Sequence, residues 1–203
     1  MLVPAFAGNT SDTGSQILNG QVALHTSIST LQTVIDNVGQ DVGVQSVAAG
    51  NVLDVTTMND THVSNDQYTS TVDISSDLGA RVTNVGGDVG ITGQAVCNSA
   101  GISTDPTITA ITSKQQCDAV DPTSRAYVDA TGVGGSFSLA NSALGNSFEA
   151  DSNASNMPVD TTQINHSNVN AVTTANVSNV AGTVSVTSAA IGNNAQIVHY
   201  STD

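Results

Sequence analysis

Hydrophobic and polar residues alternate along several short stretches of the chain, so that every second residue is apolar. The pattern is clearest in residues 41–47 (DVGVQSV), 71–75 (TVDIS) and 182–188 (GTVSVTS). A period of two places successive side chains on opposite faces of an extended strand, and these stretches therefore predict β-strands. Gly-Gly, Asn-Gly and Gly-Asn pairs interrupt the alternation and predict turns.

One strand-and-turn pattern occurs four times. Small residues precede an asparagine in residues 46–55, 93–102, 141–150 and 187–197. The four asparagines follow one another at steps of 47, 48 and 47 residues, and they are Asn51, Asn98, Asn146 and Asn193. A fixed period of this length predicts stacked structural units rather than one globular core.

Further columns of the alignment contain similar residues. Alanine lies three positions before each asparagine, at Ala48, Ala95, Ala143 and Ala190. The position directly before it holds Gly50, Cys97, Gly145 and Gly192. Because glycine and asparagine tolerate positive φ, we expect each Gly-Asn pair to turn a strand sharply. The asparagines then act as turn formers alone or, if successive repeats lie one β-spacing apart, as an amide ladder.

These patterns predict an all-β fold, a β-solenoid or parallel β-helix-like stack of about four 47-residue repeats. We expect a leader at residues 1–24 and one solenoid domain at 25–203, with repeats at 25–71, 72–119, 120–166 and 167–203. Each repeat also has a poorly matched half, for instance residues 56–67 and 151–163, which we interpret as loop. Two short coils per repeat and one coil with a long side excursion both fit this pattern.

Composition supports close backbone stacking and excludes several partners. Only 38% of the 203 residues are hydrophobic and 3% are aromatic, so a conventional core is hard to fill. The net charge is −14, and the basic residues are Arg81, Lys114 and Arg125. Nucleic acid binding needs clustered basic residues, and anionic membranes repel such a chain. No apolar run approaches 18 residues, so we expect no membrane insertion.

The N-terminus and the cysteines both point to export. Ala5-Phe6-Ala7 before Gly8 has the form of a signal-peptidase site, and we interpret residues 1–24 as a signal-peptide remnant followed by an N-terminal cap or pairing strand. A start methionine followed by a few apolar residues is the alternative. Cys97 and Cys117 have no ligand-like spacing, which favours a disulfide over two buried thiols. A disulfide requires an oxidising compartment, so we expect a secreted or cell-surface protein.

Candidate catalytic and metal-binding chemistry is sparse. Asp41 and Asp88 share a column in which calcium is conceivable, but the later repeats have Ser136 and Thr183 there. Asp, Ser and Thr are equivalent as side-chain partners of turn backbone, so we expect no cofactor, with calcium as the alternative. No histidine lies near a second metal ligand, and no G-x-S-x-G motif occurs. We expect no enzymatic activity.

The repeated module resembles a known family. The residues that carry the resemblance run from Asp41-Val42 to Asn51 and from Asp88-Val89 to Asn98, and recur at Gly145-Asn146 and Gly192-Asn193. They are similar to the repeats of the alphaproteobacterial holdfast anchoring protein D family. The resemblance implies an exported, β-rich surface protein that holds an adhesive polysaccharide to the cell envelope. The resemblance implies no catalytic residue in this chain.

The predicted architecture suggests a structural function. The terminal rungs of a solenoid expose hydrogen-bonding edges, and residues 197–200 (IVHY) show no evident cap. We expect copies of the chain to pair through such edges, with residues 16–28 at the other end, into a filament, sheath or surface anchor. The expected partners are the protein itself and a surface polysaccharide. The alternative is a monomeric adhesin or carbohydrate-binding solenoid, which has few aromatic residues for sugar stacking.

Overall fold

The computed structural model describes residues 15–58, 60–70, 72–105, 109–153 and 156–200. The signal-like residues Ala5-Phe6-Ala7 lie outside this part of the chain. Twelve β-strands and no helix occur in the described residues, which confirms the predicted all-β class. The strands are β1 (Ser15–Ala23), β2 (Ser27–Val38), β3 (Val42–Thr57), β4 (Thr61–Thr69), β5 (Asp73–Val85), β6 (Val89–Thr104), β7 (Thr109–Cys117), β8 (Val120–Val133), β9 (Phe137–Ser152), β10 (Val159–Asn165), β11 (Asn170–Val180) and β12 (Val184–His199).

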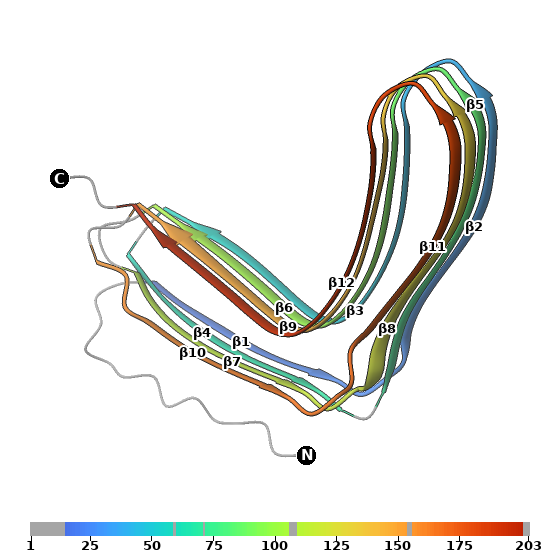
Figure 1. Ribbon diagram of the computed structural model, residues 1–203. Coiled ribbons are helices and arrows are strands. Elements are labelled where there is room, and N and C mark those ends of the chain that lie inside the picture. Colours follow the sequence, from blue (N-terminus) through green and yellow to red (C-terminus); the bar gives the residue numbers. More distant parts are fainter. Residues whose placement is uncertain (1–14, 59, 71, 106–108, 154–155, 201–203) are drawn as a thin grey trace.

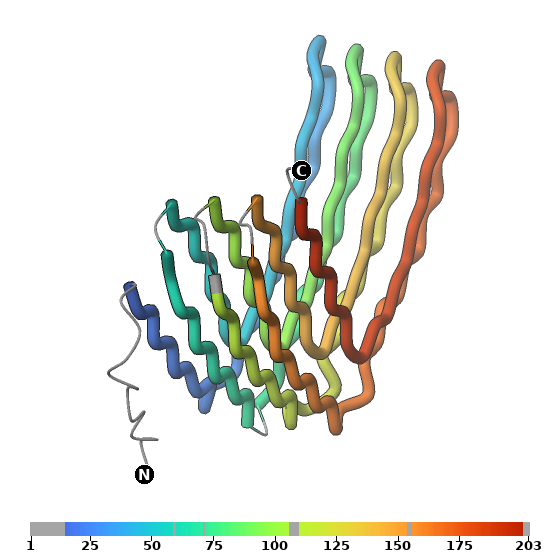
Figure 2. The backbone as a smooth tube through the Cα atoms, turned by 90° about the vertical axis from the view of Figure 1, so that its left-hand side faces the viewer, coloured from blue at the N-terminus to red at the C-terminus, as the bar shows by residue number. Residues whose placement is uncertain are grey.

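Every third strand pairs in parallel, which produces three sheets of four strands. Sheet A contains β1, β4, β7 and β10, sheet B contains β2, β5, β8 and β11, and sheet C contains β3, β6, β9 and β12. Three consecutive strands form one coil, and four coils lie side by side from the N-terminal to the C-terminal end (Figure 2). The structure is therefore a solenoid with one coil per repeat.

The cross-section of each coil has two arms, because the long strands of sheet C bend midway (Figure 1). In the first arm, the N-terminal halves of these strands face sheet B. In the second arm, their C-terminal halves face sheet A. Each arm is thus a thin two-layer sandwich, and the arms meet at a corner.

Each arm has its own hydrophobic cluster. The first arm buries residues such as Leu78, Ile91 and Phe137, whereas the second buries residues such as Ile102 and Phe148. A third, small cluster fills the corner with short side chains, namely Ala48, Val72, Ile74, Ala95, Cys97, Cys117 and Ala119. The alanine column lies in this corner, where the sheets converge and only a small residue fits between them. In the last coil the corresponding Ala190 is exposed.

The poorly matched halves of the repeats are strands rather than the loops that the sequence suggested. Residues 61–69 form β4, and its side chains alternate between buried and half-buried positions. The inward positions of this strand include Asn65 and Gln67, which are polar. Because the buried face is polar, the alternation of hydrophobic and polar residues that marks a strand is missing from the sequence here.

The Gly-Asn pairs also behave differently from the expected sharp turns. They lie inside β3, β9 and β12 at the bend of sheet C, and none of them has a positive φ. The tight turns occur instead between sheets B and C. There, positive φ values mark one column of the repeat, with φ of 57° at Asn37, 53° at Asn84, 71° at Gly132 and 54° at Asn179.

Candidate functional site: amide ladders and open terminal coils

The asparagine column forms a hydrogen-bonded ladder along the stack. Asn51 donates from Nδ2 to Oδ1 of Asn98, Asn98 donates to Asn146, and Asn146 donates to Asn193, each at 2.8 Å. The four residues occupy neighbouring register positions of sheet C, which brings their side chains within reach of one another. The ladder therefore has a direction, with every amide donating toward the C-terminal coil.

Each asparagine also connects sheet C to sheet A. Nδ2 of Asn98 donates to the backbone oxygen of Gln116 at 2.9 Å, and Nδ2 of Asn51 donates to that of Tyr68 at 3.0 Å. In both cases the acceptor belongs to the next coil. Asn98 is completely buried, so these bonds replace water for an amide that would otherwise be costly to bury.

A second amide ladder consists of glutamines on sheet A. Gln67 donates from Nε2 to Oε1 of Gln21 at 2.9 Å, Gln115 donates to Gln67 at 2.8 Å, and Gln163 donates to Gln115 at 2.8 Å. Each Nε2 also donates to a backbone oxygen of sheet C, such as that of Ser99 for Gln67. This ladder runs in the opposite direction, toward the N-terminal coil.

The glutamine ladder was not predicted, although the sequence contains its signal. Glutamine occurs at 21, 67, 115 and 163, with steps close to the repeat length. The residues around it differ in every repeat and belong to the half that we interpreted as loop. An identical polar residue recurring at the period of a solenoid is the feature that would have revealed it.

A third polar column lies next to the glutamines. Nδ2 of Asn19 donates to Oδ1 of Asn65 at 2.7 Å, and Nδ2 of Asn65 donates to Oγ of Ser113 at 3.0 Å. In the fourth coil the position holds Thr161. Oγ1 of Thr161 is buried and has no hydrogen-bond partner in the described part of the chain.

The Gly/Cys column lies against sheet A at the corner, with Gly50 next to Thr69 and Gly145 next to Asn165. A Cβ atom on Gly50 would lie 2.6 Å from the backbone oxygen of Cys97, and one on Gly145 would contact that of Gly192. Glycine is thus required at these two positions for space rather than for an unusual φ. In the second coil the column holds Cys97, whose sulfur is bonded to Cys117 of the third coil with a Cα–Cα distance of 5.9 Å.

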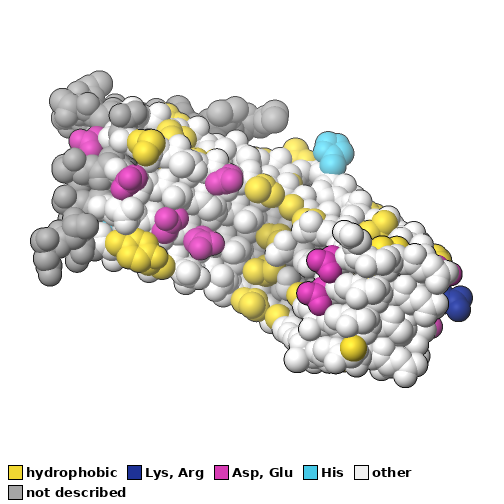
Figure 3. All heavy atoms as spheres, turned by 90° about the horizontal axis from the view of Figure 1, so that it is seen from above, with side chains coloured by type: hydrophobic (Ala, Val, Ile, Leu, Met, Phe, Trp, Pro, Cys, Tyr) yellow, Lys and Arg dark blue, Asp and Glu magenta, His cyan; other side chains and the backbone are white. Residues whose placement is uncertain are grey.

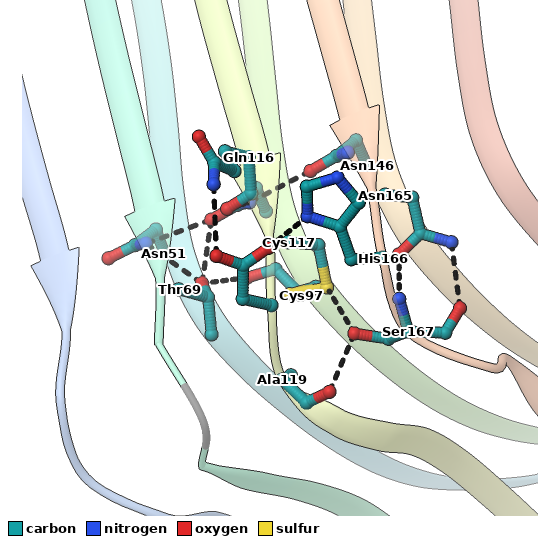
Figure 4. Close-up of a disulfide and its surroundings, with 12 residues drawn as sticks. Asn51, Thr69, Cys97, Gln116, Cys117, Ala119, Asn146, Asn165, His166 and Ser167 are labelled. Atoms are coloured by element: carbon teal, nitrogen blue, oxygen red, sulfur yellow. Dashed lines mark hydrogen bonds and ion pairs between the residues drawn. A yellow bond between two sulfur atoms is a disulfide. The ribbon is translucent and has the colours of Figure 1, made fainter.

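The disulfide links two coils, and neighbouring polar groups extend this connection to the fourth coil. Ser167 donates from Oγ to the backbone oxygen of Ala119 at 2.6 Å, and Nδ1 of His166 lies 2.7 Å from Oδ1 of Asp118 (Figure 4). Burial alone would raise the pKa of the Asp118 carboxyl, but hydrogen bonds from His166, Gln116 and Tyr68, together with the charge of His166, outweigh it and lower the pKa.

The column of Asp41 and Asp88 caps the turns between sheets B and C. Oδ1 of Asp41 accepts the backbone N–H of Asp88 at 2.9 Å, and Oδ1 of Asp88 accepts that of Ser136 at 2.7 Å. In the next coil, Oγ of Ser136 accepts the backbone N–H of Thr183 at 3.3 Å. No cluster of three potential metal ligands occurs among the described residues.

The terminal coils expose side chains that the inner coils bury. Phe137 and Leu139 of β9 are each 1% exposed, whereas their neighbours in the register, Val184 and Val186 of β12, are 52% and 46% exposed. At the first coil, the inward residues of β1 and β2 are half-buried. Within the described residues, no segment covers the outer edge of β12 or of β3.

The outer surface is mostly polar and acidic. Figure 3 shows a band of hydrophobic side chains across one face, with acidic side chains on both sides. The outer face of sheet B has a shallow groove of about 560 Å³, lined among others by Arg81, Tyr127 and Asp129. Tyr127 is 53% exposed there. No helix long and apolar enough to cross a bilayer occurs among the described residues.

Comparison with known proteins identifies one family. The family model described as holdfast attachment protein D matches residues 5–202, which confirms the resemblance carried by the repeats. No curated protein and no solved structure matches the chain.

Proposed function

Because the chain belongs to the holdfast attachment protein D family, we propose that it is an exported, non-enzymatic structural protein of the cell surface whose copies join through their terminal coils. The observation that carries this proposal is the exposure of the inward-facing columns in the last coil, at Val184 and Val186, next to an open strand edge. The assembly is a filament, sheath or surface anchor within the holdfast.

The physical reason is that a strand edge presents unpaired N–H and C=O groups. Such an edge pairs readily with another strand unless charges, bulges or a covering segment block it. The edge of β12 contains no Lys, Arg, Asp or Glu between Val184 and His199. Burying its apolar side chains under a second copy adds hydrophobic stabilisation to the backbone hydrogen bonds.

The interior supports a structural rather than a catalytic role. The buried polar residues among those described are serines, threonines, asparagines and glutamines. Most of their side chains bond to one another or to the backbone, so that they hold the coils together. No acid or base is buried beside a nucleophile in this part of the chain.

Sedimentation velocity and electron microscopy of the purified protein test the proposal. We expect assemblies whose size increases with protein concentration, with or without calcium. Val186→Lys places a charge on the inward side of the last coil and is expected to leave monomers. The control Val120→Lys changes an exposed valine of the third coil, an inner coil, and should leave assembly intact. Monomers of the unmodified protein at all concentrations would refute the proposal.

A second candidate function is binding of a surface polysaccharide, which the groove on sheet B favours. Tyr127 offers an exposed aromatic face, and Gly79 is its neighbour in the same column, where the side chain of Gln32 lies over the glycine and lines the groove. Sugar rings stack on aromatic faces, and Arg81 and Asp129 provide hydrogen-bonding groups. Co-sedimentation with the isolated polysaccharide is expected to be lost in Tyr127→Ala and kept in Tyr127→Phe. Equal binding by both variants would argue against the groove.

A further inference from the structure

We propose that copies join head to tail and in register, with the fourth coil of one copy on the first coil of the next, so that the amide ladders run unbroken through the assembly. This inference rests on the proposed self-association and adds its polarity and register.

The asparagine ladder ends in a donor at one side and an acceptor at the other. Oδ1 of Asn51 accepts no hydrogen bond from the described residues, whereas Oδ1 of each later asparagine accepts one from the asparagine of the preceding coil. At the other end, no coil follows Asn193 among the described residues, and its Nδ2 donates only to Gln163 O of its own coil, at 3.3 Å. If the first coil of a second copy lay on the fourth coil, Asn193 could donate to Oδ1 of Asn51 in that second copy.

The glutamine ladder also ends in complementary groups, but its acceptor lies at the C-terminal coil and its donor at the N-terminal coil. Oε1 of Gln163 accepts no hydrogen bond in the described part of the chain, although Oε1 of Gln115 accepts one from Gln163. Nε2 of Gln21 donates to Val52 O and keeps a second N–H. The same placement that extends the asparagine ladder brings Gln21 of the new copy over Gln163.

The third polar column points to the same neighbour. Thr161 has a buried hydroxyl with no hydrogen-bond partner among the described residues, which is costly in a folded protein. In the repeat register, the residue that would follow Thr161 is Asn19 of the next copy. The Oδ1 of Asn19 accepts no hydrogen bond from the described residues, so the threonine hydroxyl can donate to it.

The apolar columns continue in the same register. Val184 and Val186 occupy the columns that Val42 and Val44 begin in the first coil. Tail-to-tail pairing would place two copies of β12 antiparallel to each other. Two identical ends would then meet, so neither the donor of Asn193 nor the acceptor of Gln163 would find its complement in the other copy. The ends therefore favour head-to-tail contact, which produces an open polymer rather than a closed dimer.

Single-cysteine variants test this register. Val34 and Asn176 belong to one outward-facing column of sheet B, in the first and fourth coils, and both are exposed. Parallel neighbours lie about 4.8 Å apart, within the Cα separation that a disulfide spans. Mixing Val34→Cys with Asn176→Cys under mild oxidation is expected to give cross-linked dimers. Ser185→Cys, exposed on sheet C of the same coil, is the control and should not cross-link to Val34→Cys.

The outcomes separate this inference from the proposed function. Cross-linking of Asn176→Cys with itself would show tail-to-tail contact and overturn the inference while leaving self-association intact. Assemblies that sediment but give no mixed cross-link would overturn the register. Absence of any assembly, by sedimentation of the unmodified protein, would refute the proposed function together with the inference.

Discussion

Replacing Asn98 by alanine tests the energetic weight of the asparagine ladder. Its side chain is completely buried and takes part in four hydrogen bonds. It accepts from Asn51 and from Thr69 at 2.8 Å each, and it donates to Gln116 O at 2.9 Å and to Asn146 at 2.8 Å. At about 1 kcal/mol of net stabilisation per bond, Asn98→Ala should lower the free energy of unfolding by about 4 kcal/mol.

The matched control is Asn193→Ala, the same substitution in the same column. Asn193 is exposed, accepts one ladder bond from Asn146 and donates only a long bond of 3.3 Å. We expect its loss to cost about 1 kcal/mol. Urea unfolding followed by far-ultraviolet circular dichroism, on the monomeric fraction and with the disulfide intact, gives both values. Equal, small shifts of the urea midpoint in the two variants would refute the idea that the ladder stabilises the stack.

Four further predictions follow from the same contacts. Gln115→Leu removes a completely buried amide of the second ladder, and the urea midpoint should fall as for Asn98→Ala. The double variant Cys97→Ala, Cys117→Ala should lose about 3 kcal/mol of stability, and added reductant should then change its midpoint no further. Because the pKa of Asp118 is lowered in the folded state, its stabilisation is present above about pH 4 and is lost as the pH falls below it; Asp118→Asn should flatten the acid limb of a stability–pH curve. Asp88→Ser should retain the turn bond and the wild-type midpoint, whereas Asp88→Ala should lower it by about 1 kcal/mol, and a chelator should change neither value.

Most of the correct predictions about the fold came from the repeat period. It placed Asn51, Asn98, Asn146 and Asn193 in one column, and the structure has them in adjacent register positions. The number of coils per repeat stayed open because the halves between these columns have a polar inner face. In β4, Asn65 and Gln67 point inward, so a search for alternating hydrophobic residues predicts a loop there.

The bend of sheet C and the role of glycine could not be derived from local patterns. The Gly-Asn pairs indicated turns, but Gly50 is needed because the backbone of the next coil approaches it closely. Such crowding depends on the neighbouring coil rather than on the residues next to Gly50 in the chain. The open ends likewise become visible only when the exposed Val184 and Val186 are compared with their buried counterparts in the register.

Helical reconstruction of the assemblies by electron cryomicroscopy would show directly how the copies meet. Each copy contributes four coils, and at about 4.8 Å per coil we expect polar filaments with an axial rise of about 19 Å per subunit. In these filaments Asn193 of one copy should lie beside Asn51 of the next. Filaments whose subunits meet through the flat faces of the sheets, with both ladder ends left unpaired, would rule out joining through the terminal coils.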